Sequence, residues 1–456
     1  MNPVEPMVAH VMGTRYGDLP DTVIAAAKIF VLDTFSCALA GSTGPSAEAA
    51  LAAAKQWGDG DGARVWARPD RLPPASAAVV NAYQIHCLEF DCVHEGGVLH
   101  PMSTLMAATM AEVDRQAGMS RTINGEDLIE AIAMGIDVSC SIATASNAPM
   151  RFFRPALTGA FGATTAVAKL RGFDGPQLHN ALGLYYGQAG GNMQAHIEGS
   201  KLLGLQVGFG ARNAIVACDL AEAGIAGPKD ILTGMYGYLV LMEGDYDLEP
   251  VWSEWGKVFR LAEVGHKPFP SGRLTHFAVD ALQRMMAAHG FGTDDVDSVV
   301  CEVPPLAMRL VGRPDIPNPE PNYAKLCLGY VCATTLINGT VTQHDFTGEA
   351  LGRPDVHALA ARVTVHEDGN PDLNAFGPQT ITVTLRNGTT HSETITHAIG
   401  DPKNPLPRDR QLEKFWACWE AAASDMPRSQ GEELIDMIDQ LETLDDSARL
   451  IGLICP

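Results

Sequence analysis

The feature that most constrains the fold is a series of apolar, small-residue-rich segments in the first half of the chain. PPASAAVVNAYQIH and MSTLMAATMAEVDRQAG both place apolar residues at helical spacing, and the second ends at Gly118. The run TVIAAAKIFVLDTFSCALAG after Asp21 and the segment after Asn124 have the same character. RFFRPALTGAFGATTAVAKLRGF is so rich in small residues that helices could pack closely around it. This pattern predicts a large helical unit.

A change from helical to partly strand-like residue patterns after about residue 265 predicts a second unit. From Ser298 the runs SVVCEVPP, RVTVHED and QTITVTLRNGTTHSETIT have strand character, and Asn387-Gly388 is a strong hairpin signal. Helical stretches at 275–289 and 323–337 interleave with them, and amphipathic helices return from Asp409 to Ile454. We therefore predict a mostly α protein with an α+β lid. Its parts are a helical domain (1–265), the lid (266–403) and C-terminal helices (404–456) that return to the helical domain.

Composition limits the classes of function. A chain of 456 residues with 46% hydrophobic content can bury a large core. Its net charge of −22 argues against nucleic-acid and anionic-membrane partners, which most of its surface would repel. The ten cysteines form no CxxC pair, so we expect reduced thiols in a cytoplasmic protein. We also expect neither a signal peptide nor a membrane span. An acidic protein can still bind an anionic substrate where its few cations come together. Lys and Arg inside apolar stretches are therefore candidates for such a site.

The stretch HCLEFDCVHEGGVLHP, residues 86–101, is the densest group of reactive side chains. It holds three histidines, three acids, two cysteines and two adjacent glycines between two predicted buried helices. A blander interpretation is that these residues cap helices and line a turn, with His86 a satisfied core histidine. The density of the cluster favours a functional site instead.

Two more groups of cations point to anion binding. Lys201 stands at the mouth of an apolar helix, where the helix dipole disfavours it, although a surface lysine would also fit. The predicted domain boundary reads HKPFPSGRLTH, and its cations at Lys267 and Arg273 suggest that it binds carboxylates in a cleft between domains. A solvated linker is the alternative, but such linkers are seldom both prolyl and aromatic.

Six blocks taken in order resemble the MmgE/PrpD family over nearly the whole chain. They are HCLEFDCVHEGGVLHP, ALTGAFGATTAVAKLRG, EGSKLLGLQVGFGARNAIVACDLAEAG, KPFPSGRLTHFAVDA, AKLCLGYVCATTLINGTV and GDPKNPLPRDRQLEKF. The family includes 2-methylcitrate dehydratase, cis-aconitate decarboxylase and iminodisuccinate epimerase. The resemblance implies a helical domain built from both chain ends, an α+β lid, an active site between them, homodimers, and no required metal or organic cofactor.

The resemblance also implies site residues. The family's acidic motif falls on Glu89, Asp91 and Cys92, its HP histidine on His100, its two lysines on Lys201 and Lys267, and its tyrosine on Tyr330. Two departures stand out. The family often has Asp at the positions of Glu89 and Cys92, and decarboxylase-type members carry a histidine at the position of Arg154. The second departure puts decarboxylation of cis-aconitate in doubt.

These residues suit proton abstraction next to a carboxylate, where the transition state adds charge to an anionic group. His100 is the leading general base or acid, with Glu89 or Asp91 orienting it. Tyr330 could return a proton to the opposite face. We expect the electrostatic and substrate-binding contacts from Lys201, Lys267, Arg154, Arg273, His276 and His94.

The sequence leaves several functions open. The first is a cofactor-independent lyase that abstracts a proton from a small polycarboxylic acid and eliminates a β group, as a dehydratase does. The second is a cofactor-independent epimerase of an amino- or imino-polycarboxylate such as an iminodisuccinate. A third is a non-catalytic carboxylate-binding homologue. A metal hydrolase built from His86, His94 and His100 is disfavoured because no HxxxH or HExxH spacing supports it.

Overall fold

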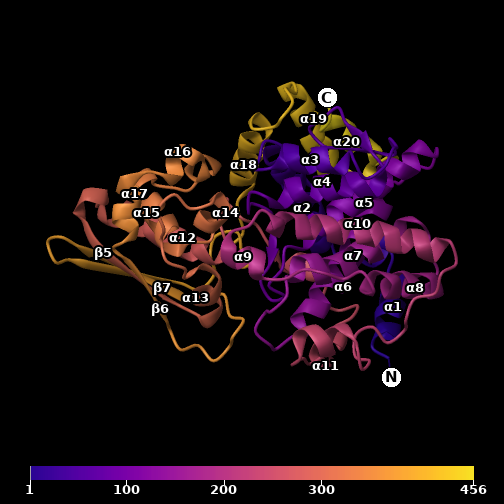
Figure 1. The fold of residues 1–456 in the computed structure, drawn as a ribbon, viewed down its shortest axis with the longest axis horizontal. Coiled ribbons are helices and arrows are strands. Elements are labelled where there is room, and N and C mark those ends of the chain that lie inside the picture. The colour runs from indigo at the N-terminus through magenta and orange to yellow at the C-terminus, as the bar shows by residue number, and fades with distance from the viewer. Residues whose placement is uncertain (1) are drawn as a thin grey trace.

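Helices form most of the chain up to residue 222, as the apolar spacing predicts. The computed structural model describes residues 2–456, and Figure 1 shows these helices, indigo to magenta, in one lobe. The helices of this lobe are α1 (Val4–Gly13), α2 (Asp21–Gly41), α3 (Ala47–Ala54), α4 (Pro74–His86), α5 (Pro101–Gly118), α6 (Gly125–Thr144), α7 (Arg154–Leu170), α8 (Gly175–Tyr186), α9 (Gln194–Glu198), α10 (Leu202–Glu222) and α11 (Glu249–Trp252). Two short pairs of strands accompany them, β1 (Ala63–Arg64) with β2 (Arg71–Leu72), and β3 (Val93–His94) with β4 (Val264–Gly265).

Small residues set how closely these helices pack. Helix α6 crosses α7 where Gly135 faces Gly162, and a Cβ added to Gly162 would lie 2.3 Å from the carbonyl oxygen of Gly135. The two backbones therefore touch, and any larger residue would force the helices apart. Asn124 caps α6 as its sequence position suggests, because its side chain accepts a hydrogen bond of 2.8 Å from the Asp127 amide.

The second lobe contains a four-stranded sheet with helices against it (Figure 1). The strand order is β6-β5-β7-β8, with β5 and β6 parallel and the other pairs antiparallel. The predicted Asn387-Gly388 hairpin joins β7 to β8, and Gly388 adopts a φ of +87° that suits glycine. The elements are β5 (Val296–Val303), β6 (Val363–Glu367), β7 (Gln379–Leu385), β8 (Thr390–Ile395), α12 (His276–His289), α13 (Pro305–Val311), α14 (Pro321–Lys325), α15 (Leu328–Asn338), α16 (Gly348–Leu351) and α17 (Pro354–Ala360).

The C-terminal helices lie on the helical lobe. Helices α18 (Arg408–Glu420) and α19 (Arg428–Asp439) pack on α2, and α20 (Ala448–Leu453) packs on α5 (Figure 1). Lys414 fixes α18 in place, because its Nζ lies 2.6 Å from the Asp33 carboxylate on α2. The chain is thus mostly α with a small α+β part, and the predicted fold class is confirmed.

Helix α2 is the one helix among residues 2–456 that is long and apolar enough to cross a membrane by length and composition. Of its most apolar window, 72% is buried inside the protein. Its packing on α4 and α18 gives it the character of a core helix, for which an apolar composition is expected.

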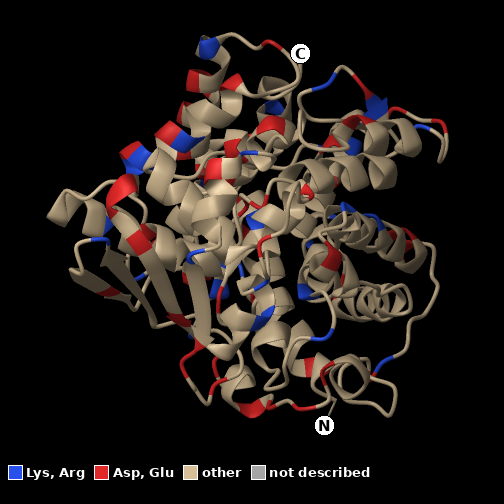
Figure 2. Ribbon diagram, turned by 60° about the vertical axis from the view of Figure 1, so that its left-hand side comes forward, with Lys and Arg blue, Asp and Glu red and all other residues tan. Residues whose placement is uncertain are grey.

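The excess of acid is distributed over many elements. Figure 2 shows Asp and Glu positions throughout the view, interspersed with Lys and Arg rather than separated from them. Buried cations are a separate group, and several of them contact the loop at 86–101, namely Arg154, Lys267, Arg273, Lys325 and Lys414.

Candidate active site

Local structure brings the loop at 86–101 to the boundary between the lobes. Helix α4 ends at His86, and Pro101 starts α5 at its first turn, where a missing N–H costs nothing. Between them β3 pairs with β4, Val93 opposite Gly265. This short pairing carries Lys267, two residues beyond β4, back onto the loop.

Glu89 and Lys267 form a buried ion pair in this loop. Lys267 Nζ lies 2.9 Å from Glu89 Oε2 and donates a second bond, also 2.9 Å, to the Glu89 carbonyl. Glu89 has a φ of +54°, a conformation that L-residues rarely adopt, so the loop holds this residue under local strain. Burial works to raise the pKa of Glu89, but Lys267, followed by the nearby histidines, holds it well below its usual range. Glu89 is therefore a carboxylate.

Asp91 and His86 form the second pair. His86 Nδ1 lies 3.0 Å from Asp91 Oδ2, and its Nε2 lies 3.5 Å from Glu89 Oε1. Burial opposes charge on His86, yet Asp91 and Glu89 together raise its pKa. The two buried carboxylates are thus each paired, Glu89 with Lys267 and Asp91 with His86, which is the condition for keeping such charges buried.

His100 stays neutral beside this balanced cluster. Its Nδ1 lies 2.9 Å from the Cys92 carbonyl oxygen, which can only accept, so Nδ1 carries the proton and Nε2 carries the lone pair. Nε2 faces Glu89 Oε2 at 3.9 Å. Burial lowers the pKa of His100 to about 4. The result is an unprotonated imidazole nitrogen available as a base at neutral pH.

A narrow cavity of about 70 Å³ lies next to His100 and is lined by both lobes. The helical lobe provides polar groups from Glu89, His100 and His196, and the other lobe provides Arg273. Apolar side chains complete the wall, namely Val93, Val98, Leu99, Met150, Phe153, Pro155, Met193, Leu274, Leu310, Val311, Leu326 and Phe376. A few polar groups in an apolar cleft between lobes are typical of a small-molecule site.

The structure brings together five residues that the sequence singled out. Glu89, Asp91, His100 and Lys267 form one buried cluster, and Arg273 lines the same cavity. The guanidinium of Arg273 is already engaged, however. Its Nε donates to Glu95 at 2.7 Å, and its two other nitrogens donate to backbone carbonyls, including that of Ile399 at 2.7 Å. Arg273 therefore adds positive charge near the cavity while it ties the lobes together.

Two predicted catalytic residues do not lie at this cavity. Lys201 precedes α10 with its side chain 44% exposed, and it pairs with Glu320 at 3.3 Å. Tyr330 is buried on α15, but its hydroxyl donates to the carbonyls of Asp345 and Ala350. In this structure Lys201 is a surface lysine. Tyr330 links α15 to the segments at Asp345 and Ala350 within the lid.

Three predicted substrate contacts also have other partners. Arg154 is buried against Glu243, with Nη2 and Oε2 3.0 Å apart, and so is not free to bind a substrate carboxylate. His94 Nε2 lies 3.1 Å from Glu263 Oε2, and its Nδ1 accepts from the Gly97 amide at 2.9 Å. The ring of His276 is fully buried, with Nε2 3.2 Å from the Ser271 carbonyl. All three side chains are bound to other groups of the protein and so hold the structure around the site.

The sequence reasoning passed over three residues that the structure places near the site. His196 lines the cavity and Arg313 bonds to its ring. Lys325 is buried with its Nζ 3.0 Å from the Cys87 carbonyl, and burial lowers its pKa to about 8. A lysine inside the apolar AKLCLGYVCA block meets the criterion of a cation in an apolar stretch, which could have singled it out. Nothing in the local sequence marks Arg313.

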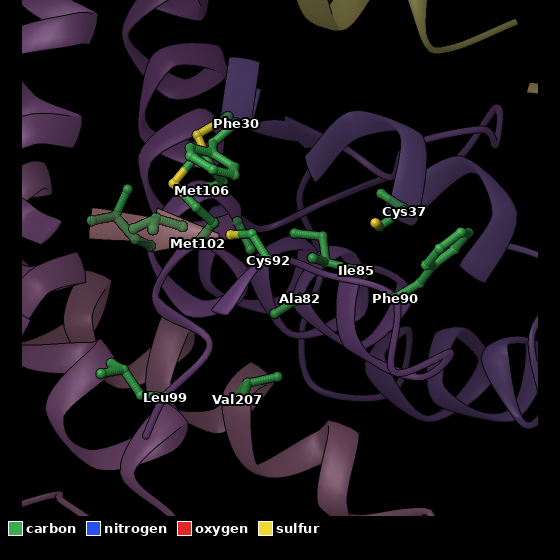
Figure 3. Close-up of a cluster of buried hydrophobic side chains, with 14 of the residues drawn as sticks. Phe30, Cys37, Ala82, Ile85, Phe90, Cys92, Leu99, Met102, Met106 and Val207 are labelled. Carbon is green, nitrogen blue, oxygen red and sulfur yellow. The ribbon is translucent and has the colours of Figure 1, made fainter. Parts of the chain in front are cut away.

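Cys92, where the family often has Asp, lies in an apolar environment. Figure 3 shows its thiol among Ile85, Met102 and neighbouring side chains of the core. Burial raises the pKa of this thiol well above its usual value. Its backbone carbonyl, rather than its side chain, serves the site by binding His100.

The side chains of His86, Asp91 and His100 could hold a metal ion, since one ligand atom of each lies within 4.8 Å of the others. His94, which the metal-hydrolase alternative requires, is not in this group and is bound to Glu263. Within the group, His86 Nδ1 is engaged by Asp91 and His100 Nδ1 by the Cys92 carbonyl.

Comparisons with known proteins agree with the geometry. The model of the MmgE/PrpD N-terminal domain matches residues 5–251, and that of the C-terminal domain matches residues 269–442. Cis-aconitate decarboxylase of Homo sapiens is 28% identical over 99% of this chain and 94% of that protein, and the protein of that name from Mus musculus is 26% identical over 99% and 93%. The mitochondrial 2-methylcitrate dehydratase of Yarrowia lipolytica is 31% identical over 24% of this chain and 22% of that protein. These relatives support a lyase-type enzyme, and the two domain matches show that the chain belongs to the MmgE/PrpD family.

Proposed function

We propose that this protein is a cofactor-independent lyase of the dehydratase type. It abstracts a proton next to a carboxylate of a small polycarboxylic acid and then eliminates a β group. The observation that carries the proposal is His100, a largely enclosed imidazole whose unprotonated Nε2 stands at the cavity beside the Glu89–Lys267 pair.

The charges around His100 suit a base that must become a cation during the reaction. When His100 Nε2 takes the substrate proton, Glu89 at 3.9 Å and Asp91 at 3.5 Å stabilise the imidazolium. Lys267 stands behind Glu89 and keeps it ionised. The imidazolium then returns its proton to the departing oxygen, so that hydroxide leaves as water.

The electron pair of the broken C–H bond moves toward the substrate carboxylate, which needs positive charge and hydrogen-bond donors near it. Arg273 lines the cavity, and three more cations contact residues beside it, Lys267 at Glu89, Arg313 at His196 and Lys325 at the Cys87 carbonyl. In a chain with a net charge of −22, this gathering of cations supports an anionic substrate.

An epimerase of an amino- or imino-polycarboxylate is the alternative, because it begins with the same proton abstraction. It requires a second acid on the opposite face of the stereocentre. Tyr330 or a lysine could fill this role. The Tyr330 hydroxyl is bound to backbone carbonyls within the lid, whereas Lys267 lies in the cluster beside His100. An epimerase of this chain would therefore use a lysine rather than Tyr330 as its second acid.

Proton NMR in D2O tests the proposal directly. The enzyme is incubated with citrate-like, aconitate-like and aminodisuccinate-like polycarboxylates in the presence of a chelator, with the variant His100→Gln in parallel. New vinyl signals that depend on His100 support a lyase of the dehydratase or decarboxylase kind, and a product that keeps every carboxylate of the substrate identifies the dehydratase. Loss of an α-proton signal with new diastereomer signals and no olefin indicates an epimerase instead. Vinyl signals that vanish on addition of chelator would contradict a reaction without metal, and no change with any substrate would contradict the proposed enzyme.

A further inference from the structure

His196 is a second imidazole at the cavity, and it comes from a different element than His100. It lies on the short helix α9, is 6% exposed, and lines the cavity together with His100 and Glu89. Its Nδ1 lies 3.1 Å from Arg313 Nη2, and Arg313 Nη1 donates to the His196 carbonyl, also at 3.1 Å. Among residues 2–456 its Nε2 has no hydrogen-bond partner, and it is not one of the fully enclosed nitrogens.

Arg313 determines which nitrogen of His196 carries the proton. A guanidinium has only donors, so the nitrogen that it contacts must present a lone pair. The proton of the neutral ring therefore sits on Nε2, the nitrogen that is left free. Burial, followed by the charge of Arg313, lowers the pKa of His196 to about 3. The ring is neutral at physiological pH and presents an N–H donor.

The two imidazoles of the cavity thus have opposite tautomers. The Cys92 carbonyl requires Nδ1–H on His100 and leaves a lone pair on Nε2. The Arg313 guanidinium requires a bare Nδ1 on His196 and leaves Nε2–H. One ring can remove a proton, whereas the other can only donate a hydrogen bond. This division of roles within one cavity is what proton abstraction next to a carboxylate requires.

We propose that His196 is a second catalytic residue, which donates a hydrogen bond from Nε2–H to the substrate carboxylate next to the carbon that loses its proton, and that Arg313 is its positioning residue. This inference rests on the proposed function. His100 Nε2 accepts the proton, and the C–H electron pair delocalises onto the carboxylate oxygen held by His196. The pair then forms the double bond as the β group leaves with its own electrons. His196 itself keeps its proton throughout, as a neutral imidazole that acts as an electrophile does.

Assembly of this donor depends on both lobes. His196 belongs to α9 at the edge of the helical lobe, whereas Arg313 follows α13 in the other lobe, and Figure 1 shows α9 at the boundary. Arg313 is held in turn by the Leu310 carbonyl at 3.1 Å and by the Tyr323 ring, whose centroid lies 4.9 Å away. The tautomer of His196 is therefore fixed only where the lobes meet.

The first experiment compares His196→Phe, which removes the donor, with His196→Gln, whose amide can still donate. Loss of one donor to a developing oxyanion lowers kcat by about 100-fold to 1,000-fold, so we expect this loss in His196→Phe with a smaller change in KM. His196→Gln should recover part of kcat. His179→Gln is the matched control, since His179 is a surface histidine bound to the Lys229 carbonyl at 2.9 Å. A kcat in His196→Phe within about twofold of the wild type would overturn the proposal.

The second experiment determines which ring nitrogen of His196 carries the proton, and it does not depend on enzyme activity. Nitrogen NMR of the ¹⁵N-histidine-labelled protein, with His196 assigned by its absence in His196→Gln, should show Nε2–H and a bare Nδ1 from pH 6 to 8. Arg313→Met should lose this preference and Arg313→Lys should keep it. An imidazolium or an Nδ1–H ring at pH 7 contradicts the inference even if the enzyme is an active lyase. Inactivity on every polycarboxylate, with the tautomer as expected, overturns instead the proposed function and the catalytic role that rests on it.

Discussion

At the scale of single residues, two neighbouring histidines have pKa values shifted in opposite directions. The rings of His86 and His100 lie 4.9 Å apart; His86 is buried, and the side chain of His100 is 14% exposed. His86 has one nitrogen on Asp91 and the other toward Glu89, so the carboxylates outweigh burial and raise its pKa. His100 uses its Nδ1 on a neutral carbonyl, and burial lowers its pKa. The partner of Nδ1, a carboxylate for His86 and a neutral carbonyl for His100, therefore helps to shift the two pKa values in opposite directions.

The pH dependence of activity should reflect this shift. A base with a pKa of about 4 stays unprotonated well below 6.5, so kcat/KM, corrected for substrate ionisation, should stay level from pH 8 to 6. It should fall only as the pH approaches about 4. An acid limb centred near 6.5 would show that His100 has an ordinary pKa and would contradict the assignment.

The buried pair of Glu89 and Lys267 leads to a second prediction. Lys267→Met leaves a buried carboxylate without its cation, so we expect loss of turnover and a loss of about 3–5 kcal/mol in the free energy of unfolding. The double variant Lys267→Met/Glu89→Gln should recover most of the stability but not the activity. Urea unfolding and turnover assays measure both quantities. Equal stability of the single variant and the wild type would count against the pair.

At the scale of elements, the site depends on contacts between segments far apart in the chain. The two-residue pairing of β3 with β4 sets Lys267 against the loop, and α18 holds the same point from the other side. Lys414 of α18 donates to the carbonyls of Phe90 at 2.8 Å and Lys267 at 3.0 Å while it pairs with Asp33. Helix α18 thus fixes the backbone of two site segments.

Replacement of Lys414 tests this bracing. Lys414→Met should lower the free energy of unfolding by about 3–5 kcal/mol, because Asp33 is left buried without a partner. Adding Asp33→Asn should restore part of it. Lys55→Met, which removes a pair between a half-exposed lysine and Asp70, is the control and should cost no more than about 1 kcal/mol. Similar losses in Lys414→Met and Lys55→Met would contradict the bracing role.

At the scale of the whole molecule, the boundary between the lobes buries several neutral histidines. His196, His266 and His276 are buried near it and His100 is largely so, and loss of solvent is the largest cause of a lowered pKa in each. The folded state therefore leaves these rings unprotonated at pH values where the unfolded chain, with a pKa of about 6.5, binds protons.

Stability should accordingly decrease on acidification. For a histidine whose pKa is lowered in the folded state, the free energy of unfolding falls as the pH drops below about 6.5, by about 1.4 kcal/mol per pH unit for each ring. We expect the urea midpoint to fall markedly between pH 7 and 5. His276→Gln has no imidazole to titrate at this position. Its free energy of unfolding should therefore depend less steeply on pH, by the contribution of about one proton. A variant with the same slope as the wild type would argue that His276 has an ordinary pKa in the folded state.

Local sequence alone determined the helices, the hairpin and the chemical character of the loop at 86–101. These follow from spacing, caps and turn residues, which act over a few positions, as the Asn124 cap and the Gly388 turn show. Only the tertiary structure decided which residues share the cavity. It put Lys201 on the surface and Arg154 on Glu243, and it brought His196 and Arg313 together from different lobes. Partners within the loop help to set the state of His86 and His100, but burial and distant partners such as Lys267 for Glu89 and Arg313 for His196 could not be read from neighbours in the chain.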